Sequence, residues 1–63
     1  MLELNEYKYI KEVKGRSPFT SALTIQEYID GVKWRLGQWY GVDYTLFTEK
    51  DVYIFLKYLE STE

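Results

Sequence analysis

The chain of 63 residues contains no cysteine and no histidine. Without cysteine it can form neither a disulfide nor a thiolate metal site. Without histidine it lacks the commonest metal ligand and the commonest general base at neutral pH. No run of acidic residues has the spacing of a calcium-binding loop, and no glycine-rich phosphate loop is present. These absences predict a protein that is not an enzyme and that uses no metal or cofactor.

Long apolar segments are absent as well. No run approaches the roughly 20 apolar residues of a membrane-spanning helix, and the chain does not open on a signal-peptide pattern. We therefore expect a cytoplasmic protein with residues 1–63 in one small domain. So short a chain buries only roughly 60% of its unfolded surface. Its stability should therefore depend on its seven Tyr, three Phe and two Trp, or on self-association.

The clearest pattern predicts a helix over residues 24–40. Thr24 and Glu27 have the spacing of a capping box, and Gly41 stands where a left-handed C-terminal cap is expected. Between these ends, apolar residues recur at helical spacing and form one stripe. The stripe consists of Ile25, Tyr28, Ile29, Val32, Leu36, Trp39 and Tyr40. We expect this stripe to face the core.

A second helix is predicted over residues 48–60. Thr48 and Asp51 repeat the capping pattern, and an apolar stripe follows, made of Val52, Phe55, Leu56 and Leu59. Residues 42–47, between the helices, alternate for a few positions and are rich in β-branched and aromatic residues. They predict either a short strand or an extended loop that fills the core between the helices with Val42, Tyr44 and Leu46.

The N-terminal segment, residues 1–23, is interpreted as a strand or arm followed by a loop. Tyr7, Tyr9, Lys11 and Val13 occupy alternate positions, so in a strand their side chains would lie on one face. This pattern favours a strand over residues 6–13, paired with residues 42–47. The expected fold is then α+β, an antiparallel two-helix hairpin with an N-terminal strand. The alternative is a small three-helix bundle, in which residues 3–13 form the third helix.

Trp34 is the main candidate for binding a partner. It lies about 180° from the apolar stripe of its helix, and Gly31 and Gly37 leave the backbone near it bare. Because Trp, Tyr and Arg dominate interface hot spots, we interpret this face as a docking surface that also includes Arg35 and Gln38. The competing interpretation is that the N-terminal segment covers Trp34, which is then a second core residue.

Ile54 and Tyr58 raise the same question on the second helix, because both point away from its apolar stripe. They could extend the docking surface, cover the N-terminal segment, or simply be exposed. Taken with Trp34, they define the surface through which we expect the chain to form a homodimer.

The segment 7–16 carries four cations, Lys8, Lys11, Lys14 and Arg16, interleaved with Tyr7 and Tyr9. Cations that neutralise phosphates and aromatic rings that stack on bases would suit nucleic acid. The simpler interpretation is a solvated face or a strand edge protected by lysines.

The preferred hypothesis is a small protein–protein interaction module that regulates or inhibits a larger protein by occluding its surface. This rests on analogy with other compact, cysteine-free, aromatic-rich chains, including regulators encoded by phages. The alternative hypothesis is a nucleic-acid-binding regulator that uses the basic segment 7–16. A membrane partner is not expected.

Overall fold

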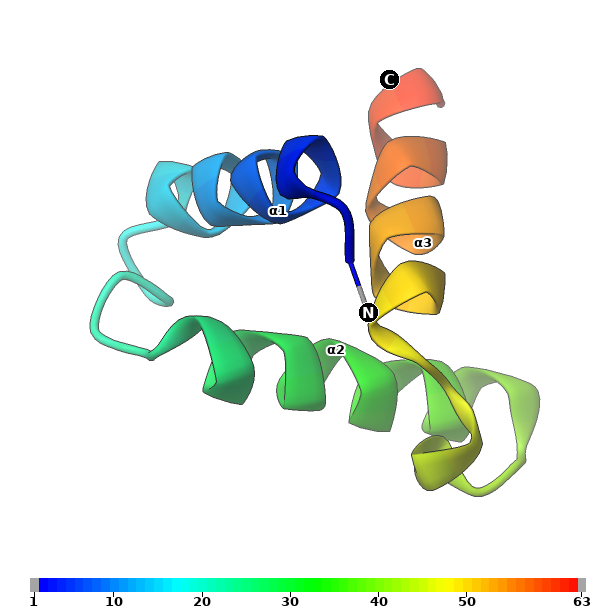
Figure 1. Ribbon diagram of the computed structural model, residues 1–63. Coiled ribbons are helices and arrows are strands. Elements are labelled where there is room, and N and C mark those ends of the chain that lie inside the picture. The colour runs from blue at the N-terminus through cyan, green and yellow to red at the C-terminus, as the bar shows by residue number, and fades with distance from the viewer. Residues whose placement is uncertain (1, 63) are drawn as a thin grey trace.

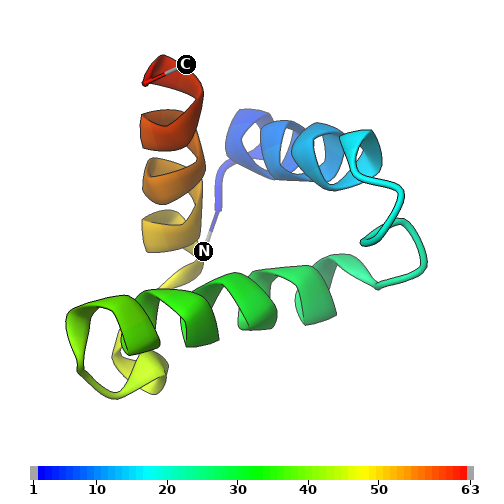
Figure 2. The same cartoon turned by 180° about the vertical axis from the view of Figure 1, so that it is seen from behind.

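The computed structural model describes residues 2–62, which form three α-helices and, in this range, no β-strand. The helices are α1 (Leu4–Arg16), α2 (Ile25–Tyr40) and α3 (Glu49–Ser61), with a short 3₁₀ turn, η1 (Tyr44–Leu46), between the last two. Helices α1 and α2 lie side by side and run in opposite directions, and α3 crosses both steeply (Figure 1). The view from behind shows the same arrangement (Figure 2).

The expected α+β fold is therefore wrong, and the three-helix alternative fits. Residues 6–13 lie within α1 and do not form a strand. The face of α1 that packs inwards contains Glu6, Tyr9, Ile10 and Val13, which follow helical spacing. The charged Glu6 interrupts the apolar pattern of this face in the sequence. The alternation from Tyr7 to Val13 was therefore the more visible pattern, and it favoured a strand.

Residues 42–47 form neither a strand nor a plug in the core. Asp43 begins η1, and its carboxylate accepts hydrogen bonds from the Thr45 backbone N–H (3.0 Å) and hydroxyl (2.8 Å). These bonds hold the carboxyl's pKa below its usual value. Val42, Tyr44 and Leu46 are all exposed. The local turn formed by the Asp43 side chain replaces the extended backbone that the alternation predicted.

The expected antiparallel pair of α2 and α3 is also wrong, since the antiparallel neighbours are α1 and α2 (Figures 1 and 2). The segment between α2 and α3 contains η1, which packs across α2 at Gly37. Because this segment is folded onto α2 rather than forming a tight turn, α3 leaves α2 at a steep angle.

The ends of α2 lie where the sequence predicts them. Thr24 Oγ1 accepts from the Glu27 backbone N–H (3.1 Å), and Glu27 Oε1 accepts from the Thr24 backbone N–H (3.0 Å). The Thr24 backbone N–H, and after it the Thr24 hydroxyl, lower the pKa of the Glu27 carboxylate. Gly41 ends the helix in the left-handed region, with φ of 70°. Thr48 and Asp51 form the corresponding capping box at the start of α3.

The core is formed where the three helices meet. Its fully buried side chains are Ile10 of α1 and Val52 of α3, joined by Ile29 and Leu56. The partly buried residues of α2 that pack on this cluster lie in its first half and end at Val32. The second half of α2 therefore extends beyond the part of the core to which α1 contributes. None of the helices described is long and apolar enough to cross a membrane.

Two polar contacts connect α1 to α3. The buried carboxylate of Glu6 pairs with Lys50, and this hydrogen bond lowers the pKa of Glu6 and raises that of Lys50. The Tyr9 hydroxyl donates to the carboxylate of Glu60, and its oxygen lies 3.3 Å from the Leu56 carbonyl oxygen. Burial, and then the Glu60 contact, raise the pKa of Tyr9 to about 12.

Candidate protein-binding surfaces

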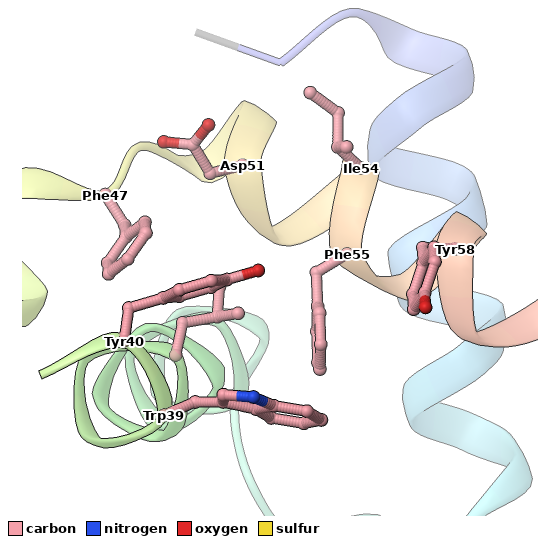
Figure 3. A pocket seen from close by; sticks show the side chains of 8 residues that line it. Trp39, Tyr40, Phe47, Asp51, Ile54, Phe55 and Tyr58 are labelled. Carbon is pink, nitrogen blue, oxygen red and sulfur yellow. The ribbon is translucent and has the colours of Figure 1, made fainter.

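An apolar hollow lies between the second half of α2 and the outer side of α3, and we call it the aromatic groove. Its volume is about 490 Å³, within the range of ordinary binding pockets. Its lining consists of Leu36, Trp39 and Tyr40 from α2, Phe47 from the connecting segment, and Asp51, Ile54, Phe55 and Tyr58 from α3 (Figure 3).

Two aromatic pairs shape the aromatic groove. Phe55 points from α3 towards the indole of Trp39, with ring centroids 6.1 Å apart and an interplanar angle of 79° (Figure 3). Tyr40 and Phe47 form a tilted pair at 6.3 Å. Trp39 nevertheless remains 68% exposed and Tyr40 66% exposed. The pairs therefore hold large aromatic rings in fixed positions at the surface without burying them.

The exposure of Trp39 and Tyr40 corrects the prediction that the whole stripe of α2 faces the core. The stripe has the expected helical spacing, and its first part is covered by α1 and α3. Near Trp39 and Tyr40 the neighbouring elements are α3 and the connecting segment, and the rings of Phe55 and Phe47 leave both side chains largely exposed. Helical periodicity identified the face correctly, but it does not indicate how far along that face a neighbouring helix extends.

The aromatic groove carries almost no charge. Asp51 is the single charged residue of its lining. The Asp51 carboxylate accepts from the Thr48 backbone N–H at 2.8 Å and from the Thr48 hydroxyl at 3.1 Å. It also lies at the positive end of the α3 dipole. Since the Asp51 carboxylate is already hydrogen-bonded within the chain and the rest of the lining is uncharged, the groove suits uncharged, apolar side chains.

A second hollow, of about 330 Å³, lies on the other side of Phe55. The loop residues Thr20 and Leu23, the α2 residues Glu27, Tyr28, Gly31, Val32 and Arg35, and the α3 residues Phe55, Leu56 and Leu59 line it. Unlike the aromatic groove, its lining includes charges of both signs, Glu27 and Arg35.

The partner-binding residues expected from the sequence divide between separate surfaces. Ile54 and Tyr58 are exposed and line the aromatic groove, whereas Gly31 and Arg35 line the second hollow. Trp34 and Gln38 line neither and lie on the outer face of α2. Trp34 and Ile54 are therefore not brought together in one patch of this chain.

Trp34 itself is 55% exposed and is not covered by the N-terminal segment, which packs elsewhere as α1. The structure therefore does not place Trp34 in the core. The sequence pattern did not indicate that Trp39, Tyr40 and the half-buried Phe47 line a groove at the surface. The one signal that could have indicated them is the concentration of aromatic residues between positions 39 and 47.

The four cations of the N-terminal segment do not form one free surface. Lys8 and Lys11 are exposed on the outer side of α1. Lys14 donates to the Ser21 carbonyl oxygen at 3.3 Å. Arg16 is exposed and takes part in neither of the ion pairs found within residues 2–62. Of the four cations, Lys14 is thus the one that is hydrogen-bonded to the chain itself.

Within residues 2–62, no three acidic side chains come close enough together to suggest a metal site. No protein-family model, curated protein sequence or solved structure matches this chain. The geometry of its surfaces is therefore the basis on which its function must be argued.

Proposed function

We propose that this chain is a protein-binding module without catalytic activity, and that the aromatic groove is its binding surface. The observation that carries the proposal is Trp39, which is held against Phe55 and yet stays 68% exposed. The chain acts by covering a surface of a larger protein with this groove, so that other molecules cannot reach that surface.

The amount of exposed aromatic surface supports the proposal. Trp39, Tyr40 and Tyr58 are each about two-thirds exposed. An aromatic side chain offers about 150–250 Å², so these three leave on the order of 300–500 Å² of ring surface open. A contiguous apolar patch of this size on a small protein commonly marks an interaction site. Trp and Tyr are also the residues that contribute most to binding at interfaces.

The lining of the aromatic groove indicates the chemistry of the partner. A row of α3 residues with helical spacing, Asp51, Ile54, Phe55 and Tyr58, forms one wall, and α2 forms the other. A groove between two helices suits an amphipathic helix that inserts apolar side chains. Because the Asp51 carboxylate is already hydrogen-bonded to Thr48 and no other residue of the lining is charged, the inserted side chains should be uncharged.

Affinity capture with matched tryptophan variants tests the proposal. The chain is immobilised and exposed to an extract of the cells that produce it, as wild type, Trp39→Ala, Tyr58→Ala and Trp34→Ala. We expect the wild type and Trp34→Ala to retain the same protein and the two groove variants to lose most of it. Trp34 is the control, since it is a half-exposed tryptophan on the opposite face of the same helix.

Circular dichroism shows which variants remain folded. Tyr58 is the second groove variant because its ring takes part in none of the aromatic pairs described, so its loss should leave the fold intact. Equal capture by both folded groove variants and the wild type would contradict the proposal. So would recovery of nucleic acid that is lost steeply as salt rises, which is the behaviour expected of phosphate contacts.

A further inference from the structure

The side of α2 opposite Leu36 presents a further surface, which we call the Gly31 face and which overlaps the rim of the second hollow at Glu27, Gly31 and Arg35. It consists of Glu27, Gly31, Trp34, Arg35 and Gln38, all exposed. At 100° per residue these five positions fall within about a quarter of the helix circumference. This face does not include Trp39, Tyr40 or the other α2 residues of the aromatic groove.

Gly31 has no role within the chain that the structure reveals. A glycine inside a helix destabilises it relative to alanine, so interior glycines usually have a reason in packing. Gly37 has one, because a Cβ there would meet Tyr44 and Val42 at 2.9 Å. A Cβ on Gly31 would meet no atom within 4 Å. The bare backbone at Gly31 is thus open to an element from outside the chain.

The charges on the Gly31 face are arranged symmetrically about Gly31. Glu27 lies four residues before it and Arg35 four residues after it, each one turn away along the helix. Arg35 takes part in neither of the ion pairs found among residues 2–62. Glu27 uses Oε1 in the capping box, which leaves Oε2 available.

We infer that the Gly31 face binds a second copy of this chain, with the two α2 helices packed antiparallel and the two-fold axis beside Gly31. This arrangement brings Glu27 of each copy level with Arg35 of the other, which forms two ion pairs. Gly31 meets Gly31 of the second copy, so the two backbones can approach closely. Trp34 comes level with Tyr28 of the second copy.

The surface area of the chain favours such an occupant. The chain exposes 4838 Å², whereas a folded monomer of its mass, 7.6 kDa, typically exposes about 4,300 Å². The exposed Leu23 and Leu59 border the same side of α2 and would enlarge the contact beyond one helix. A second copy fits better than an unrelated protein because the charge pattern is complementary to itself.

Charge-reversal variants test the inference by sedimentation over a wide range of concentration. We expect the wild type to dimerise and both Arg35→Glu and Glu27→Lys to weaken the dimer by about tenfold or more, since each places like charges opposite one another twice. Mixing the two variants should restore dimers, because every pair then joins opposite charges. Lys11→Glu, on the outer side of α1, is the control and should dimerise like the wild type.

Gly31→Leu supplies an independent test. A Cβ on Gly31 meets no atom within 4 Å, and Gly31 is exposed at the edge of the second hollow, so the variant should fold. In the dimer it would hold the two helices apart, so it should sediment as a monomer. A wild type that stays monomeric at every concentration overturns the inference, and so does a dimer that Arg35→Glu and Gly31→Leu leave unchanged. Neither outcome affects the aromatic groove, which Trp39→Ala and Tyr58→Ala test separately.

Discussion

Gly37 of α2 and Tyr44 of η1 are packed so closely that a methyl group on Gly37 would lie 2.9 Å from the Tyr44 Cβ. The same methyl group would lie 2.9 Å from the Val42 carbonyl oxygen. Since these neighbours are backbone or near-backbone atoms, they cannot swing aside as the end of a long side chain can. The contact explains why a buried glycine is kept three residues before the end of a helix.

Gly37→Ala should therefore destabilise the chain, although alanine is the better helix former. We expect a loss of about 1–3 kcal/mol in the free energy of unfolding, the usual range for overpacking. Urea titration followed by circular dichroism measures it. A variant as stable as the wild type would contradict the close packing of η1 on α2.

Gly31→Ala is the matched variant, because it makes the same change in the same helix where the space is open. Here only helix propensity changes, and we expect the single chain to gain about 1 kcal/mol in the free energy of unfolding. The titration should be made at a concentration low enough for the chain to be monomeric. A loss of stability comparable to that of Gly37→Ala would show that Gly31 is already covered within the chain.

Ile10→Ala tests the assignment of residues 4–16 to a packed helix. Ile10 is fully buried between α2 and α3, so its truncation should cost about 2–5 kcal/mol, which could unfold so small a domain. Leu4→Ala, on the exposed side of the same helix, should change the free energy of unfolding by less than about 0.5 kcal/mol. Thermal unfolding followed by circular dichroism compares the two, and equal effects would contradict the way α1 is packed.

The elements that the sequence predicted correctly are those set by local contacts. Thr24 with Glu27 and Gly41 fix the ends of α2 through hydrogen bonds and a backbone conformation within a few residues. The start of α1 is also fixed locally, since the Glu3 backbone N–H donates to Glu6 Oε2 (3.3 Å). Glu3 is not a typical N-cap residue, however, and Glu6 breaks the apolar pattern of the inward face. The partner that makes Glu6 tolerable there, Lys50, is 44 residues away. No pattern within residues 1–23 could have indicated that pair.

The surfaces were predicted in part. The sequence placed Trp34 correctly on the side of α2 away from the apolar stripe, and this depends only on helical spacing. It assigned Trp39 to the core, because spacing alone cannot show that the partly buried α2 residues packed on the core cluster end at Val32. The separation of Trp34 from Ile54 follows from the steep crossing of α2 and α3, which is a tertiary property (Figure 1).

Tyr9 should make the stability of the chain sensitive to alkaline pH. Its pKa is raised from 10.0 to about 12 by burial and by the Glu60 carboxylate. A group whose pKa is raised on folding contributes stability that is complete below the unfolded pKa and is lost as the pH rises through the folded pKa. This contribution of Tyr9 is therefore present below pH 10 and disappears between pH 10 and about 12.

Tyr9→Phe removes the group that titrates and should reduce the fall in the free energy of unfolding over this interval. Part of the fall should remain, because burial also raises the pKa of Tyr28, and the hydrogen bond to Glu6 raises that of Lys50. The measurement is a series of urea titrations at rising pH, with Tyr7→Phe, which changes an exposed tyrosine of the same helix, as the control. If Tyr9→Phe and Tyr7→Phe lose stability as steeply as the wild type, folding does not raise the pKa of Tyr9.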